Sequence, residues 1–221
     1  MALLIDDLSS EDPNAKMHSI SRLGEIATLL GPERCVEELI PMLTELIDKI
    51  DCNPELMMTL AEQLGTLTNH LGQNEEEKAE NCAHLLRPLE IISGSDDSVV
   101  QTKAINSLKK ITEVLNENTI NGQYVELIGR LDEGDYYSMR IAACQLYAQI
   151  YRSLNEEKRE VVRTKFTKLV RDDTPMVRWG AAQAMAVICH ALDAQTITNY
   201  LLPLLKELLQ DKNDSVKVHA V

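Results

Sequence analysis

Apolar and polar positions recur along the chain at the spacing of α-helices, in runs that end at short polar turns. One apolar stripe begins at Val177 and continues at helical spacing to Leu192, and it predicts a helix over about 175–191. Thr174 precedes this helix and can cap it through its hydroxyl. Pro175 occupies the first helical position, where a missing N–H costs nothing. The segment therefore carries a complete helix-start signal.

The polar residues just before this helix mark a turn. Upstream, Asn155 and the two glutamates that follow it start another apolar stripe. That helix ends near Arg171, a basic residue suited to a helix C-terminus. Asp172 and Asp173 come next, so we expect them in a tight turn between two antiparallel helices.

The same unit of helix, acidic turn and helix recurs at steps of 41, 44, 39, 38 and 39 residues. A two-helix repeat of this length is typical of HEAT repeats. We therefore expect an all-α superhelix, or solenoid, of antiparallel helix pairs, in which each repeat buries its apolar face mainly against its neighbours. The equivalent position is held by Lys16, Met57, Gln101, Arg140, Arg178 and Lys217. The expected repeats of this single 1–221 array are 1–30, 31–71, 72–115, 116–153, 154–192 and a truncated sixth, 193–221.

Three further features of the repeats lead to local expectations. Pro41, Pro88 and Pro203 lie inside the apolar runs of first helices. Because an internal proline removes one backbone hydrogen bond, we expect a kink there rather than a new helix start. The acidic run NEEEKAEN at 74–81 is interpreted as a solvated loop. The sixth unit stops at Val221, within its second helix, so we expect a truncated array with a frayed C-terminal end.

Composition and charge exclude several kinds of partner. Aromatic residues make up only 4% of the chain, which favours aliphatic helix packing. The net charge of −13 repels phosphate backbones, so no nucleic-acid partner is expected. The start of the chain is not a signal peptide and no apolar stretch is long enough for a membrane span, so no membrane partner is expected. Five cysteines without a C-x-x-C pair indicate buried thiols in a reducing compartment. We therefore expect a cytoplasmic protein, with the nucleus as a further location.

No motif of the sequence indicates catalysis. The five histidines form no H-E-x-x-H motif and no cluster with cysteines at zinc spacing, so neither a metal nor a cofactor is expected. Glycine-rich phosphate loops and the G-x-S-x-G motif are absent. Acidic pairs such as Asp132-Glu133 and Asp172-Asp173 recur once per repeat at the same turn. That placement predicts a ridge along one edge rather than a convergent pocket.

Apolar side chains at the turn tips indicate contact with a partner. Helix dipole effects of up to about 1 kcal/mol each account for only about half of the turn acids. They do not account for Tyr136, Tyr137 or Met176, because such side chains at exposed tips usually mark an interface. Arg140, Arg178 and Lys217 oppose the helix dipole, so we expect the turn aspartates to pair with them in a row along stacked repeats.

Four motifs together carry a family resemblance. DDTPMVR at 172–178, LAEQLGTL at 60–67, LLIDDL at 3–8 and SVVQTKAINSL at 98–108 occur in the order and register of one family. The chain resembles the N-terminal repeats of the scaffolding A subunits of protein phosphatase 2A over essentially its whole length. The resemblance implies a non-catalytic, horseshoe-like scaffold that holds a catalytic subunit on its C-terminal repeats and a regulatory B-type subunit on its N-terminal ones. Those C-terminal repeats would lie beyond Val221, so a regulatory subunit is the partner expected here.

In this family the turns inside each repeat form the partner-facing ridge. The residues at matching positions, called the turn ridge below, are Asp96, Asp97, Asp135, Tyr136, Tyr137, Asp172, Asp173, Thr174, Pro175, Met176, Arg178, Asp211, Lys212, Asn213 and Asp214. Two tyrosines follow Asp135 where the resemblance leads us to expect tryptophan and phenylalanine. Trp179 replaces an expected basic residue and Gln101 an expected arginine. We therefore expect retuned contacts and a weaker Asp–Arg ladder at the third repeat.

Two other classes of protein remain as alternatives. An importin-like HEAT transport receptor would bind basic cargo, and the acidic charge fits that class, but the DDTPMVR and AEQLG motifs do not. An enzyme would need convergent polar groups, and the sequence offers none.

Overall fold

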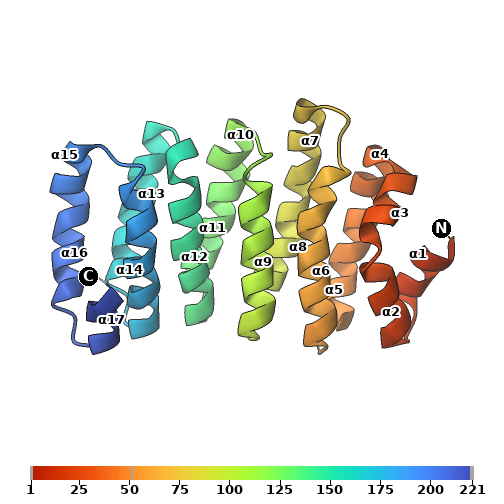
Figure 1. Cartoon of the computed structure of the whole chain (residues 1–221), viewed down its shortest axis with the longest axis horizontal. Helices are drawn as coiled ribbons and strands as arrows, with labels where there is room; N and C mark the ends of the chain where they lie inside the picture. The colour runs from red at the N-terminus through yellow and green to blue at the C-terminus, as the bar shows by residue number, and fades with distance from the viewer. Residues whose placement is uncertain (1, 51, 220–221) are drawn as a thin grey trace. The chain divides into compact units, whose positions relative to one another are not determined.

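The computed structural model describes residues 2–50 and 52–219, and over these ranges the chain forms helices joined by turns, with no strand (Figure 1). The all-α class of helix pairs predicted from the sequence is confirmed. The chain divides into two compact units, Met1–Thr119 and Ile120–Val221. The single array of six repeats stays a prediction.

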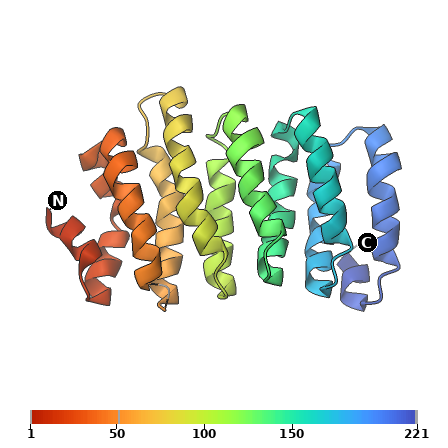
Figure 2. The same cartoon turned by 180° about the vertical axis from the view of Figure 1, so that it is seen from behind.

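The first unit is built from helix pairs in two layers. Its helices are α1 (Ala2–Ser9), α2 (Pro13–Ile20), α3 (Leu23–Leu30), α4 (Pro32–Arg34), α5 (Ile40–Ile50), α6 (Pro54–Thr66), α7 (Glu75–Cys82), α8 (Leu86–Ser93), α9 (Ser98–Ile111) and α10 (Glu117–Thr119). Helix α6 packs against α2 and α9, and α5 packs against α8. Second helices thus lie beside second helices and first helices beside first helices, as Figure 2 shows from behind.

The second unit repeats this arrangement. Its helices are α11 (Val125–Asp132), α12 (Tyr137–Ile150), α13 (Glu156–Val170), α14 (Pro175–Cys189), α15 (Ala194–Thr196), α16 (Leu202–Leu209) and α17 (Asp214–His219). Helix α14 contacts both α12 and α17, and α13 contacts α11 and α16. The turns that join α11 to α12, α13 to α14 and α16 to α17 are the intra-repeat turns of this unit.

The prolines of the first helices follow short turns with non-α winding. Such turns are η1 (Cys35–Leu39), η4 (Ile120–Tyr124) and η6 (Ile197–Leu201), which are π-helical, and η3 (Ala83–Leu85), which is a 3₁₀ turn. Pro41 comes just after η1, Pro203 just after η6 and Pro88 after η3. A proline leaves the carbonyl four residues earlier without its α-helical donor, and a change of winding relieves this mismatch. The turn η4 has the same winding without a proline, so proline is not its only cause.

The acidic run at 74–81 is helical from Glu75 onwards, and its interpretation as a solvated loop is wrong. Helix α7 begins at Glu75, and the Asn74 side chain caps it by accepting from the Glu77 backbone N–H at 2.9 Å. Glu77 in turn accepts from the backbone N–H of Gln73 at 2.9 Å. The three glutamates in the first turn of α7 also interact favourably with the positive end of the helix dipole. The charges that indicated a loop are therefore part of a capping arrangement.

The core consists mainly of aliphatic side chains, together with the buried Tyr124, Tyr147 and Phe166. All five cysteines are free thiols. Three of them are buried and Cys189 is half-buried, but Cys52 is exposed. The expectation of packed thiols is therefore wrong for Cys52, which lies in a turn rather than on a helix face. The expected fraying at Val221 lies outside the described residues.

Candidate interaction surface at the intra-repeat turns

Arg178 ties two intra-repeat turns of the second unit together. Its Nε and Nη2 donate to the two carboxylate oxygens of Asp211, at 2.6 and 2.9 Å. Its Nη1 donates to the backbone carbonyls of Asp172 and Asp173, at 2.7 and 3.1 Å. One guanidinium therefore fixes the turn before α14 and joins it to the turn before α17.

Arg140 makes the same set of bonds one repeat earlier. Its Nε and Nη2 donate to Asp172 at 2.7 and 3.2 Å, and its Nη1 donates to the carbonyls of Gly134 and Asp135 at 2.8 and 3.0 Å. A ladder of alternating arginine and aspartate thus runs through the turns of the second unit. The Asp–Arg pairing expected from the sequence is confirmed there.

The ladder pairs are shielded from water, which strengthens them. The side chains of Arg178 and Asp211 are only 15% and 8% exposed. The hydrogen bond from Arg178 lowers the pKa of Asp211 below its ordinary value, and the same interaction raises the pKa of Arg178. Planar, paired contacts of this kind are stronger than exposed ion pairs. They offset the unfavourable position of a cation near a helix N-terminus.

A side-chain oxygen at the first position of the turn fixes its backbone. Asp172 Oδ1 accepts from the backbone N–H of Thr174 at 2.8 Å, and Ser95 Oγ in the first unit accepts from that of Asp97 at 3.2 Å. The prediction that the Thr174 hydroxyl caps α14 is wrong, because this hydroxyl forms no capping hydrogen bond. It instead accepts a hydrogen bond from Arg140 Nη2 at 3.2 Å. Part of the turn ridge therefore serves the turn itself.

The outward-facing part of the turn ridge in the second unit is aromatic and apolar. Tyr136 and Tyr137 are 57% and 52% exposed, and Met176 is 48% exposed. The other exposed members of the turn ridge are Asp96, Asp135, Asp173, Pro175, Lys212 and Asp214. The half-buried members are Asp97, Asp172, Thr174, Arg178, Asp211 and Asn213. The exposed group is available to a partner, while Asp172, Arg178 and Asp211 hold the frame beneath it.

Two residues of this surface were absent from the turn ridge predicted from the sequence. Arg140 belongs to the ladder, and its equivalence to Arg178 in the repeat was the signal for it. Val99 is 53% exposed beside the first-unit turn, at the repeat position that Met176 holds in the second unit. The sequence had already predicted that Arg140 pairs with a turn aspartate, whereas Val99 was missed and a comparison of the repeats position by position would have found it.

The third-repeat turn in the first unit is organised differently. Asp97 caps α9, with its Oδ1 accepting from the backbone N–H groups of Val99 and Val100 at 2.8 and 3.1 Å. Gln101, at the arginine position of the repeat, is buried and donates through Nε2 to the carbonyl of Ser93 at 2.9 Å. The Gln101 amide therefore bonds within its own repeat and does not link two turns as Arg178 does. This agrees with the weaker Asp–Arg ladder expected at the third repeat.

The acidic pair at 132–133 belongs to the packing between helices. Asp132 is 7% exposed, and it accepts a hydrogen bond from the Tyr147 hydroxyl and one from Lys165 Nζ at 3.1 Å. Burial raises the pKa of Asp132, while the bonds from Tyr147 and Lys165 oppose that rise. Of this pair, only Glu133 is exposed, and it also pairs with Lys165, at 3.1 Å.

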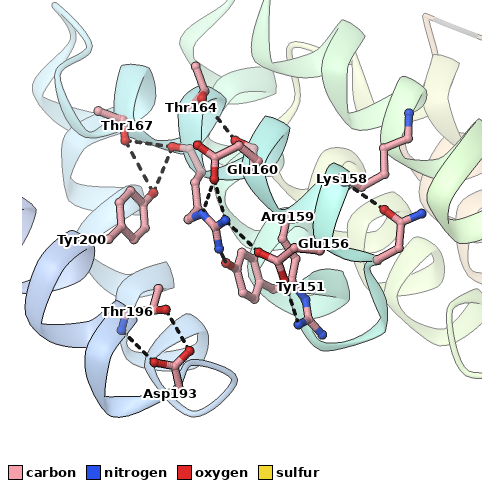
Figure 3. Close-up of polar contacts among 12 residues, drawn as sticks. Tyr151, Glu156, Lys158, Arg159, Glu160, Thr164, Thr167, Asp193, Thr196 and Tyr200 are labelled. Carbon is pink, nitrogen blue, oxygen red and sulfur yellow. Dashed lines mark hydrogen bonds and ion pairs between the residues drawn. The ribbon is translucent and has the colours of Figure 1, made fainter.

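A polar groove of about 480 Å³ lies between α13 and the segment α15–η6 (Figure 3). Its lining includes Glu160, Thr164 and Thr196. The Thr164 hydroxyl donates to the backbone carbonyl of Glu160 at 3.1 Å, and the Thr196 hydroxyl donates to the Asp193 carboxylate at 2.8 Å. The Tyr200 hydroxyl donates to the carbonyl of Arg163 at 3.0 Å, and Arg163 pairs with Glu160 at 2.5 Å. These internal bonds give the groove a structural role between helices of the second unit.

Among residues 2–50 and 52–219 no cluster of acidic, histidine and cysteine side chains is arranged to hold a metal ion. The part of the chain that the structure describes also contains no helix long and apolar enough to cross a membrane.

Stacked helix pairs that expose intra-repeat turns define an α-helical repeat protein of the solenoid class. Solved structures of this class share the fold. Cex1p has a TM-score of 0.58 at 17% identity, over 94% of this chain and 42% of that one. A designed armadillo repeat protein has a TM-score of 0.51 at 20% identity, over 98% and 95%. No model of a protein family matches the chain.

Sequence relatives narrow the similarity to one group of proteins. A protein phosphatase 2A scaffold subunit of Dictyostelium discoideum is 34% identical, over 92% of this chain and 34% of its own. In Homo sapiens, the A beta isoform of the 65 kDa regulatory subunit of serine/threonine-protein phosphatase 2A is 36% identical, over 87% and 31%. The chain is thus a homologue of the scaffolding A subunits of protein phosphatase 2A, as the sequence motifs predicted. It spans about a third of the length of these relatives, which are named as scaffold or regulatory subunits and not as enzymes.

Proposed function

We propose that the chain is a non-catalytic scaffold of a protein phosphatase 2A holoenzyme, and that its intra-repeat turns dock a regulatory B-type subunit. The names of its relatives support the scaffold role and favour it over the transport-receptor alternative. Contact with a catalytic subunit belongs to the proposal only for a longer chain with further C-terminal repeats beyond Val221. A cytoplasmic or nuclear location is part of the same proposal.

One observation carries the docking surface. Tyr136, Tyr137 and Met176 are about half exposed at the tips of turns whose backbones are fixed by Arg140 and Arg178. Rigid presentation of aromatic and apolar side chains lowers the entropic cost of binding, and such side chains often dominate interface energies. The turns of the second unit therefore have both the contact groups and the support that an interface needs.

The test measures binding of a purified B-type regulatory subunit by calorimetry. The triple variant Tyr136→Ser, Tyr137→Ser, Met176→Ser should bind at least about tenfold more weakly than the unmodified chain, because each hot-spot side chain contributes more than about 1 kcal/mol. Val187→Ser is the matched control, since Val187 is 51% exposed on the same helix as Met176 but far from the turn. The proposal fails if the unmodified chain does not bind, or if both variants bind as it does.

A further inference from the structure

A small groove opens beside an intra-repeat turn of the first unit. It lies between the ends of α5 and α8 and the start of α6, and has a volume of about 260 Å³. Its lining consists of Ile47, Asp48, Met57, Ile91, Gly94 and Ser95. Ile47 and Met57 are almost fully buried and form an apolar floor, while Asp48 lies exposed at the rim.

The equivalent groove in the second unit is crossed by ion pairs. That groove has a volume of about 440 Å³ and is lined by Arg178 and Asp211 among others. The Arg178–Asp211 pair spans it at 2.6 Å, and Arg171 pairs with Glu207 across it at 2.7 Å. Partner groups there would have to compete with bonds already made.

In the first unit both members of the ladder pair are replaced. Met57 holds the repeat position of Arg178, and Ser95 holds that of Asp211. Methionine has no donor for a carboxylate, and Ser95 Oγ is used within its own turn, where it accepts from Asp97 N–H at 3.2 Å. The ladder pair that closes the second-unit groove therefore has no counterpart here, and an adaptable thioether lies at the floor.

We propose that this groove receives one apolar side chain of the regulatory subunit, next to a basic residue of the same partner segment. The inference rests on the function proposed above and adds an anchoring site to it. The volume lies below the roughly 300–1,000 Å³ of small-molecule sites, which favours a single side chain as occupant. Asp48 of the lining is exposed, and so is Asp96, which follows the lining residue Ser95 in the chain. Neither carboxylate is ion-paired among the described residues, so a cation fits beside Asp48. The net charge of −13 favours a basic partner segment as well.

The test follows methyl NMR signals of the chain, labelled with ¹³C at its methionine ε-methyl groups, during titration with a purified B-type regulatory subunit. Met176 reports docking at the second-unit turns, and Met57 reports occupation of the groove. Each signal is assigned by its loss when that methionine is replaced by leucine. We expect both signals to shift at the same molar ratio of partner to chain.

A second arm closes the groove with the ladder pair of the second unit. The double variant Met57→Arg, Ser95→Asp should weaken binding of the regulatory subunit by at least about tenfold. Met57→Leu keeps an apolar floor and should bind within about twofold of the unmodified chain. Circular dichroism and thermal unfolding of each unbound variant verify that it is folded.

The outcomes separate the two proposals. A shift of the Met176 signal without a shift of the Met57 signal overturns the groove and leaves the docking function standing. The absence of both shifts overturns the docking function and the groove with it. If the closed double variant is folded and binds as tightly as the unmodified chain, the groove is overturned even when the Met57 signal shifts.

Discussion

Arg178 bridges two turns by donating to both carboxylate oxygens of Asp211, at 2.6 and 2.9 Å, while it holds the carbonyls of its own turn. Arg140 does the same with Asp172. The ladder thereby couples local turn geometry to the stacking of repeats within the second unit. It explains why arginine is placed near the start of α12 and α14 despite the helix dipole.

A double-mutant cycle on Arg178→Ala and Asp211→Ala should give a coupling free energy of about 1–3 kcal/mol, because the pair is largely shielded and doubly hydrogen-bonded. Urea denaturation of the four proteins measures it. Arg171 and Glu207 offer a matched pair in the same groove, at 2.7 Å but 58% and 44% exposed. Their coupling should be at most about 1 kcal/mol. Equal coupling for the two pairs would show that burial does not strengthen the ladder.

The pH dependence of stability should report the same contact. The bond from Arg178 lowers the pKa of Asp211 from the ordinary aspartate value of 3.8, so the ionised carboxylate stabilises the folded state at neutral pH. This contribution is fully present above 3.8 and is lost as the pH falls through the folded-state pKa. The destabilisation caused by Asp211→Asn should therefore be constant at neutral and weakly acidic pH and shrink below 3.8.

The measurement is urea unfolding of the unmodified chain and of Asp211→Asn across that pH range. Asp173→Asn is the control, because Asp173 is exposed in a neighbouring turn. A difference between Asp211→Asn and the unmodified chain that does not change with pH would contradict the assignment.

The glycine of the AEQLG motif has a packing reason. A Cβ added at Gly65 would lie 2.7 Å from the Cβ and 3.1 Å from the Cα of Ser107 on α9. Ser107 Oγ also donates to the Ala61 carbonyl at 2.7 Å, so the two helices touch at this point. Gly65→Ala should therefore reduce the free energy of unfolding by about 1–3 kcal/mol, through overpacking.

Gly122→Ala is the comparison for Gly65→Ala, because a Cβ at Gly122 would meet no atom within 4 Å. Stability should stay the same or rise by about 0.5–1 kcal/mol in that variant. Thermal or urea unfolding of both variants decides the matter, and a similar loss in both would mean that helix contact is not the reason for Gly65.

The helices were predictable because their signals are local. Asn155 and Asp97 cap α13 and α9, and apolar stripes at helical spacing follow each of them. The pairing of turn aspartates with arginines was also predictable, because the repeat spacing brings equivalent turns together. These features can be predicted from the sequence of one repeat and its neighbour alone.

The wrong predictions arose where the same residue type occurs in two different structural roles. The glutamates of α7 were interpreted as a solvated loop, although a capping residue, Asn74, precedes them. Thr174 was assigned to its own helix, and its hydroxyl instead meets Arg140 from the previous repeat. Such choices depend on side chains that arrive from elsewhere in the fold, so a local pattern cannot decide them.

Tyr147 and Asp132 form a buried polar contact in the second unit whose removal should be costly. The Tyr147 hydroxyl donates to Asp132, whose side chain is 7% exposed and whose pKa is raised by burial. Tyr147→Phe should reduce stability by about 1–3 kcal/mol, because it leaves a buried carboxylate short of one donor. It should also raise the pKa of Asp132 further, since in the unmodified chain the bond from Tyr147 opposes the rise.

Urea unfolding measures the change in stability, and NMR titration of the Asp132 carboxyl carbon measures the change in pKa. Tyr136→Phe removes an exposed hydroxyl and should change neither quantity. If Tyr147→Phe leaves the pKa of Asp132 where it was, the hydroxyl does not contribute to the charge balance of this site.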